Sequence, residues 1–287
     1  MNPFEQEGNW YKANLHCHTT TSDGDSSVAE RIEQYKEREY SVLAITDHGL
    51  TNDVSGLSSE EFLVISGMEM HPPCIGDGDL YHLVALNVPL GLEFPVETDA
   101  NTRIERVKSL GGEVIFGHPY WCGHNINHLL ALKDYIGIEV FNTTCTCNGK
   151  GTSSAYWDDL LDAGKMLPAV ASDDTHYDWD RFAGWTMIRA RELTVESVMD
   201  ALRTGCFYAS CGPVIEDMTT DGEKMVVRCS PAAEVHFMGQ RWQGQSHYAK
   251  DGELITQAEF TYTEGLKYVR VEVVDSDGKR AWTNPIL

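Results

Sequence analysis

Residues 11–210 alternate short apolar runs with segments whose apolar positions recur every three or four residues. The apolar runs predict strands that are buried on both faces, and the periodic segments predict amphipathic helices. Ser27 and Glu30 form a capping-box pattern at the start of one of these helices. Alternating strands and helices indicate βαβ units and a mainly parallel sheet. The predicted strands are 11–16, 41–46, 62–68, 81–86, 114–117, 137–141, 167–171, 185–190 and 206–210, and the predicted helices are 27–39, 99–110, 154–163 and 195–204.

The pattern changes after Gly212-Pro213. Polar and apolar positions then alternate with a period of two, and Asp-Gly pairs supply turns, which together predict antiparallel strands. These strands are expected at 224–229, 234–238, 258–262 and 268–274. We therefore expect an α/β fold in two domains: a closed or distorted β/α barrel over 1–213, followed by a small antiparallel β-sandwich over 214–287.

Composition and charge narrow the classes of partner. The 287 residues include 44 acidic and 22 basic ones, so the formal net charge is −22. Such a surface repels phosphate backbones and anionic lipids, which argues against long nucleic acid and membrane surfaces as partners. The chain lacks an apolar run of about 18 residues and an apolar export segment at its start. The eight cysteines form no C-x-x-C pair, so we expect reduced thiols and a cytoplasmic location; the oligomeric state stays open.

Histidines and carboxylates gather where the predicted strands end. In a β/α barrel these ends converge on one face, where active sites form. His16 and His18 lie two residues apart in a strand, so both imidazoles point to one side. Imidazole and carboxylate ligands suit Zn²⁺, Mn²⁺ or Fe²⁺. A single H-x-H or Asp-Asp pair is common in turns, cores and helix caps, but the ordered set favours a metal centre. The set is His16, His18, Asp23, Asp47, His48, Glu69, His82, His118, Glu139, Asp173, Asp174 and His176.

Six motifs together resemble the PHP (polymerase and histidinol phosphatase) superfamily of metal-dependent phosphoesterases. They are LHCHTTTSDG (15–24), AITDH (44–48), SGMEM (66–70), YHLVAL (81–86), FGHPY (116–120) and SDDTH (172–176). The resemblance covers roughly residues 10–210. It implies a distorted (β/α)7 barrel with two to three divalent ions at the carboxyl ends of its strands.

The resemblance also implies a ligand set for each ion. His16, His18, Glu69 and Asp174 would hold one ion, Glu69, His82 and His118 a second, and Asp23, His48 and His176 a third. Glu69 would bridge two of them. The late motif of the family is usually Asp-x-His, so its spacing selects Asp174, while Asp173 stays open as a ligand or a supporting group.

The activity implied is hydrolysis of a phosphoric ester by a metal-bound hydroxide at a dinuclear or trinuclear site. Asp174 and His176 are candidates for handling a proton. Arg181, five residues after His176, is the candidate for gripping a phosphate, and its alternative is a surface ion pair with Asp178 or Asp180. The expected substrate is a small phosphomonoester or a short phosphodiester.

Other polar residues near these motifs have less defined roles. Asp47 precedes His48 and is expected to orient an imidazole. Glu139, inside a predicted strand, would need a cation or a hydrogen-bonding partner if it is buried. His71 follows a strand end, but Pro72-Pro73 after it indicates a turn.

Two alternative functions remain open at this point. The first is a metal-dependent hydrolase of C–N or C–O bonds, which would lack a cationic phosphate grip near the ions. The second is a binding module in which Trp242 and Trp282 of the sandwich recognise a glycan or a protein. Most of the net charge, −18 of −22, lies on residues 1–213, where the candidate ligands are. Bound divalent ions would make a local positive focus that favours a small phosphate.

Overall fold

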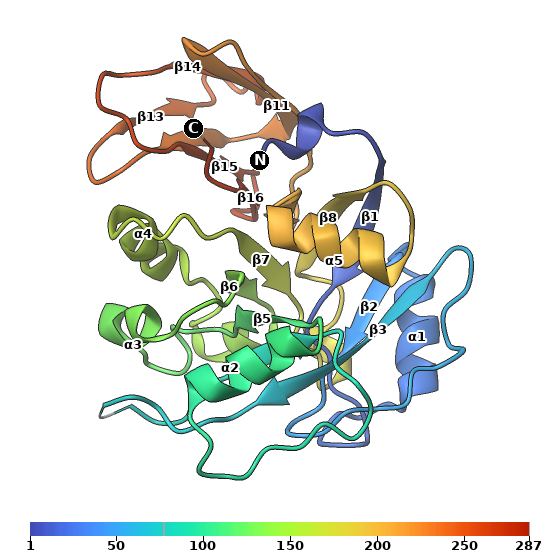
Figure 1. Ribbon diagram of the computed structural model, residues 1–287. Coiled ribbons are helices and arrows are strands. Elements are labelled where there is room, and N and C mark those ends of the chain that lie inside the picture. Colours follow the sequence, from blue (N-terminus) through green and yellow to red (C-terminus); the bar gives the residue numbers. More distant parts are fainter. Residues whose placement is uncertain (77, 287) are drawn as a thin grey trace.

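The computed structural model describes residues 1–76 and 78–286, and Figure 1 shows its strands and surrounding helices. The last residue of the predicted sandwich, Leu287, falls outside this range. Seven strands lie side by side in chain order along one sheet. They are β1 (Asn9–Asn14), β2 (Val42–Ile45), β3 (Leu63–Met70), β4 (Leu83–Leu86), β5 (Glu113–Phe116), β6 (Gly137–Asn142) and β7 (Ala169–Ser172). Every residue of β2, β4, β5 and β7 is buried, as the continuous apolar runs predict.

The strands alternate with helices less regularly than seven βα units require. The helices here are α1 (Val28–Lys36), α2 (Ala100–Ser109), α3 (Ile126–Ala131) and α4 (Ser154–Asp162). No helix joins β2 to β3 or β3 to β4 in the described segments, and β4 runs antiparallel to both neighbours. The α/β class with a large, parallel-rich sheet is confirmed, whereas the (β/α)7 count is not.

The two ends of this row of strands meet where the candidate ligands lie. The segment after β1 pairs with the segment after β7 through a parallel bridge between Cys17 and Thr175. The Asp174 amide donates to the His16 carbonyl at 3.0 Å, and the His18 amide donates to the Thr175 carbonyl at 2.9 Å. This closure brings the first and last motifs of the chain into contact.

Two further strands extend the sheet beyond β1, on the side away from β2. β8 (Trp185–Ala190) runs antiparallel to β1, and β9 (Phe207–Ser210) runs antiparallel to β8. The helix α5 (Val195–Thr204) connects them and ends at Gly205, which has a left-handed φ of 70°. The Thr186 hydroxyl donates to the Ala171 carbonyl at 3.0 Å and so joins β8 to β7.

The C-terminal strands form two layers at one end of the molecule, next to the N-terminal 3-10 helix η1 (Pro3–Glu5), as Figure 1 shows. One layer is the three-stranded antiparallel sheet β10 (Ile215–Thr220), β11 (Lys224–Ala232) and β14 (Ile255–Thr261). The other contains β12 (Glu234–Met238), β13 (Gly244–Tyr248), β15 (Arg270–Val274) and β16 (Arg280–Thr283). Val227, Phe237, Phe260 and Val271 belong to the core between them.

The second layer is not a separate sheet, because β16 pairs antiparallel with β9. One sheet of 13 strands therefore runs from the predicted barrel into the predicted sandwich. The smaller antiparallel sheet is confirmed, and the domain boundary at 213/214 stays a prediction. None of the helices among the described residues is both long and apolar enough to cross a membrane.

Candidate metal centre

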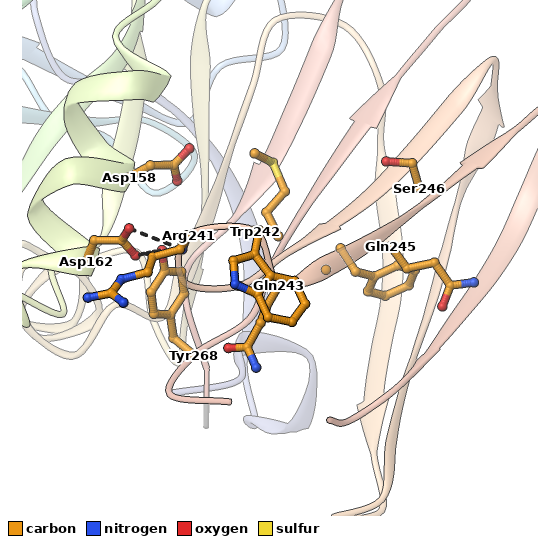
Figure 2. Close-up of a pocket in the computed structure, with 12 residues that line it drawn as sticks. Asp158, Asp162, Arg241, Trp242, Gln243, Gln245, Ser246 and Tyr268 are labelled. Carbon is orange, nitrogen blue, oxygen red and sulfur yellow. Dashed lines mark hydrogen bonds between the residues drawn. The ribbon is translucent and has the colours of Figure 1, made fainter. Parts of the chain in front are cut away.

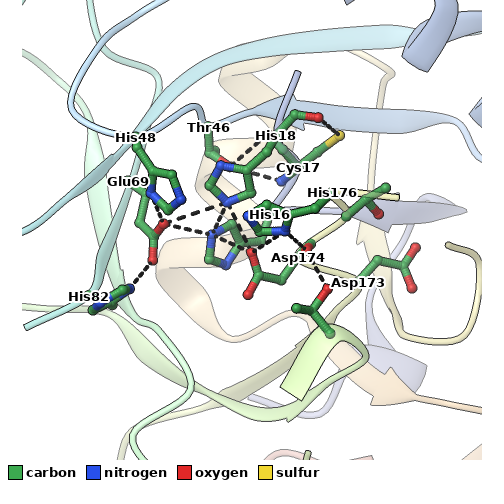
Figure 3. Close-up of polar contacts among 12 residues, drawn as sticks. His16, Cys17, His18, Thr46, His48, Glu69, His82, Asp173, Asp174 and His176 are labelled. Carbon is green, nitrogen blue, oxygen red and sulfur yellow. Dashed lines mark hydrogen bonds and ion pairs between the residues drawn. The ribbon is translucent and has the colours of Figure 1, made fainter. Parts of the chain in front are cut away.

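The imidazoles of His16 and His18 converge on one point just beyond the end of β1. Their Nε2 atoms lie 3.1 Å apart, and the Nε2 of each lies 3.6 Å from Glu69 Oε2. Asp174 Oδ1 lies 3.2 Å from His16 Nε2 and 3.0 Å from His18 Nε2. All four side chains are buried. The structure thus brings together the first predicted ligand set, which Figure 3 shows.

Glu69, at the end of β3, faces two groups of histidines with its two oxygens. Oε1 lies 2.7 Å from His82 Nδ1 and 3.4 Å from His118 Nε2. Oε2 faces His16 and His18 and lies 2.7 Å from His48 Nδ1. The second predicted set is therefore also assembled, with Glu69 between it and the first.

The third predicted set lies at the more open side of the cluster. Asp23 Oδ2 lies 3.4 Å from His48 Nε2, and Asp23 Oδ1 lies 3.6 Å from His176 Nε2. The His176 Nδ1–H donates to the Asp174 carbonyl at 2.7 Å, which leaves Nε2 directed at Asp23. His18 also reaches this group through Nδ1, 3.8 Å from Asp23 Oδ1.

The structure separates the roles of the two adjacent aspartates. Asp174 has a left-handed φ of 56° and points into the cluster, whereas Asp173 points away from it. The Asp173 carboxylate accepts bonds from the hydroxyls of Tyr35 and Thr143. It also accepts three backbone N–H bonds from 182–184. Asp173 is therefore a supporting group that fixes the turn after the motif, and Asp174 is the candidate ligand.

Glu139, inside β6, finds the partners that a buried carboxylate needs. Its Oε1 accepts a bond from His16 Nδ1–H at 2.9 Å, which directs His16 Nε2 toward the cluster. Its Oε2 accepts bonds from the His118 amide and the Asn142 side chain, each at 2.9 Å. Glu139 thereby fixes the orientation of His16 and the backbone of His118, whose φ of 22° is positive.

The carboxylates give the cluster a strongly negative potential. Burial alone would lower the pKa of His16, but Asp174, Glu139 and Glu69 outweigh burial and hold its pKa well above the usual range. Burial would likewise raise the pKa of Asp174, yet the nearby imidazoles keep that pKa well below its usual value. The buried carboxylates therefore stabilise positive charge at the cluster.

The donor set fits divalent ions. With Zn–N bonds of about 2.0–2.1 Å, two ligand atoms on a tetrahedral ion lie about 3.3 Å apart, close to the spacings around His16 and His18. Three buried atoms here lack a hydrogen-bond partner among the described residues, namely His18 Nδ1, His48 Nδ1 and Glu69 Oε2. The short contact between the last two lacks hydrogen-bond geometry. Unpaired buried polar atoms cost free energy, which bound ions would offset.

A comparison with solved structures identifies the fold. A two-domain protein from Bacteroides vulgatus, containing a predicted PHP-like metal-dependent phosphoesterase, matches with a TM-score of 0.56 at 15% identity. The match covers 97% of this chain and 96% of that one. The chain shares the fold of this PHP-like protein. The resemblance drawn from the six motifs is thus confirmed at the level of the fold.

Two other structures are more distant. An amidohydrolase from Chromobacterium violaceum has a TM-score of 0.46 at 15% identity and covers 58% of this chain and 88% of its own. A candidate metal-dependent phosphoesterase from Bifidobacterium adolescentis has a TM-score of 0.47 at 17% identity and covers 67% and 94%. Both scores are too low to support a conclusion. No protein-family model matches the sequence, and no curated protein matches it either.

In this PHP-like fold, His71 lies in the cluster, although Pro72-Pro73 indicated a turn. His71 Nε2 lies 3.4 Å from Glu69 Oε2, and its ring lies 4.8 Å from that of His48 and 4.4 Å from that of His82. The signal was its spacing of two from Glu69 at a strand end, which places both side chains on one side. Sequence analysis also missed Cys122, whose sulfur lies 3.4 Å from His118 Nδ1.

Asp47 does not orient an imidazole, contrary to the prediction. Its carboxylate accepts bonds from the backbone and hydroxyl groups of Thr19 and Ser22 and from the Asn52 side chain. These bonds shape the turn that carries Asp23. Asp47 therefore supports the third ligand set through the backbone.

A cavity of about 340 Å³ opens over the cluster. Trp121, Tyr177 and Trp179 line it, each with about half of its surface or slightly less exposed, so their rings can stack on a flat substrate group. Arg181 is absent from the lining and forms an ion pair with Asp178, as in the alternative interpretation. The described lining residues include no lysine or arginine.

A second pocket, of about 310 Å³, lies between α4 and the β12–β13 hairpin, and Figure 2 shows it. Trp242 stands on its edge with 88% of its surface exposed. Asp162 closes one side by accepting bonds from the Arg241 amide and the Tyr268 hydroxyl. Trp282 is buried in the core, so the two tryptophans do not form one binding face.

Proposed function

We propose that this protein is a metal-dependent phosphoesterase that hydrolyses a small phosphomonoester or a short phosphodiester. The observation that carries the proposal is Glu69, whose two oxygens face different groups of imidazoles. Two or three divalent ions (Zn, Mn or Fe), when bound, would neutralise phosphoryl oxygens and lower the pKa of a bound water toward about 7. The residues proposed to hold them are the nine of the ligand set: His16, His18, Asp23, His48, Glu69, His82, His118, Asp174 and His176.

The protein side chains would act by positioning. Glu139 keeps His16 in the tautomer that presents Nε2, and the Asp174 carbonyl does the same for His176. Of the two candidates for handling a proton, Asp174 and His176, we propose His176 as the one that holds it for the leaving group, because the low pKa of Asp174 keeps that carboxylate ionised. The buried walls around Glu69 exclude water, which strengthens every electrostatic interaction at the site.

The aromatic rim supports a substrate with a flat or sugar-like group beside its phosphate. Tyr177 and Trp179 belong to the segment after β7 and line the cavity together with Trp121. A cavity of about 340 Å³ suits a small molecule and not an extended polyanion. The net charge of −22 agrees with this restriction.

The composition of the cavity lining also favours testing a second function, hydrolysis of C–N or C–O bonds. Because the described lining contains no lysine or arginine, a phosphate would be held by the ions and not by a side-chain cation. A metal-dependent hydrolase of C–N or C–O bonds needs no such cation. A screen with Mn²⁺ of p-nitrophenyl phosphate, bis(p-nitrophenyl) phosphate, amides and lactones separates the two. Hydrolysis of the phosphate esters supports the proposal, and hydrolysis of only the amides or lactones would refute it.

A further inference from the structure

A second group of metal-ligating side chains lies outside the candidate metal centre. Cys74 belongs to the β3–β4 connection, His124 precedes α3, and His128 lies in the first turns of α3. One ligand atom from each lies within 4.8 Å of the others. None of these three residues lines the cavity over the candidate metal centre.

The spacing in this group is close to that around a tetrahedral zinc ion. Cys74 Sγ lies 3.9 Å from His124 Nδ1. Bonds of about 2.3 Å to sulfur and 2.0–2.1 Å to nitrogen place two such ligand atoms about 3.5 Å apart. The rings of His124 and His128 meet edge to face, with centroids 5.4 Å apart, so they converge without stacking. Because the three ligand atoms lie within 4.8 Å of one another, each pair is within about 1.3 Å of that spacing.

His124 is buried in a manner that suits a ligand. Only 2% of its surface is exposed, and its Nδ1 faces the Cys74 sulfur. The rings of Tyr81 and Phe116, with centroids 5.0 Å and 5.5 Å away, fix its position.

The β3–β4 connection is packed so that the Cys74 sulfur faces α3. A Cβ on Gly78 would lie 2.5 Å from Cys74 Sγ, so the glycine permits the backbone to pass close to the sulfur. The Tyr81 hydroxyl donates to the His128 carbonyl at 3.2 Å and accepts a bond from the Ile75 amide at 3.4 Å. These contacts hold the two segments together at the place where the three ligands meet.

We propose that Cys74, His124 and His128 form a separate site for one zinc-like divalent ion, with water in the fourth position. Thiolate and imidazole ligands select Zn²⁺ over the harder cations that carboxylates prefer. The His128 Nδ1 accepts a capping bond from the Asn125 amide at 3.1 Å, and metal binding would exchange that bond for a coordinate bond. The ion would tie the connection between His71 and His82 to α3.

The test is a cobalt titration of the metal-stripped protein. Thiolate ligation gives Co²⁺ an intense charge-transfer absorption, and ligation by imidazole and carboxylate alone does not. We expect this band in the wild type. Cys74→Ser should abolish it and reduce the cobalt content by one ion per chain. His128→Gln, which keeps the thiol, should reduce the content by the same amount.

Two further variants separate this site from the candidate metal centre. Cys122→Ser removes the thiol beside His118 and should keep the band, and His16→Ala should keep the band while lowering the metal content of the main cluster. An unchanged band in Cys74→Ser, or a band lost in Cys122→Ser, would overturn the proposal. Absence of phosphoesterase activity would refute the proposed function and leave these cobalt results as they are.

Discussion

Replacement of Glu139 by glutamine tests whether a group that need not touch an ion controls the candidate metal centre. The Glu139 carboxylate is 1% exposed and accepts bonds from three donors: His16 Nδ1, the His118 amide and the Asn142 side chain. A glutamine amide has one oxygen and one NH₂ group, so one of these donors must face another donor. If the NH₂ group faces His16, that ring shifts to the tautomer that protonates Nε2.

The expected loss of metal affinity is about 10–100-fold, as for other groups that orient metal-binding histidines. This corresponds to about 1.4–2.7 kcal/mol. One unsatisfied buried donor also lowers the free energy of unfolding by about 1–3 kcal/mol. Isothermal titration of the metal-stripped protein with Mn²⁺ or Zn²⁺ measures the affinity, and denaturant unfolding measures the stability.

Glu272→Gln is the matched control, because Glu272 is equally a buried carboxylate with several donors. It is 5% exposed and accepts bonds from Arg270, Arg280 and Trp282, all far along the chain from the motifs. It should lose stability and keep the metal affinity of the wild type. Metal affinity within about twofold of the wild type in Glu139→Gln would refute the orienting role of Glu139.

Four other outcomes follow from the structure. Asp23→Asn should remove the third ion and retain the others, so elemental analysis should show a partial loss, and complete loss would contradict the three-set arrangement. Ser27→Ala breaks the capping box of α1 and should lower the free energy of unfolding by about 1 kcal/mol in denaturant. Arg270→Ala removes the buried cation from Asp158 and leaves Glu272 with Arg280 alone, and it should cost about 3 kcal/mol, measured in the same way. Burial raises the pKa of Tyr208 to about 12 from 10.0, so the free energy of unfolding should fall by up to about 2.7 kcal/mol as the pH rises from 10 to 12. Tyr208→Phe should remove this contribution to the loss of stability at alkaline pH. If the variant and the wild type lose the same stability between pH 10 and 12, Tyr208 does not contribute.

The local pattern predicts most elements because the strands are buried on both faces. The expected strands at 41–46 and 62–68 correspond to β2 and β3, and the capping box at Ser27 is present. The missed elements are α3, β10, β13 and β16. All four are only four to six residues long, and β13 is mostly exposed, so it lacks an apolar signal.

Long-range pairing is what the sequence leaves undetermined. The antiparallel direction of β4 and the pairing of β16 with β9 depend on contacts between distant segments. The sequence therefore predicted two separate units where one sheet crosses the boundary. An apolar strand carries no mark of its direction, since both directions bury the same side chains.

The candidate site follows the sequence more closely, because its ligands lie at strand ends that the barrel brings together. All nine predicted metal ligands are within the cluster, whereas Arg181 is paired with Asp178 outside the cavity lining. The role of Arg181 depended on where a loop directs one side chain, which no strand period determines. His71 shows the opposite error: a turn signal concealed a side chain that the strand had already directed inward.

The most direct test of the central claim is the metal content of Glu69→Ala and His16→Ala, measured by elemental analysis beside the wild type. Circular dichroism would establish that both variants remain folded. We predict that the wild type binds two or three divalent ions at the main cluster, that both variants lose metal there, and that phosphatase activity disappears with it. Unchanged metal content in both folded variants would contradict the assignment of the site.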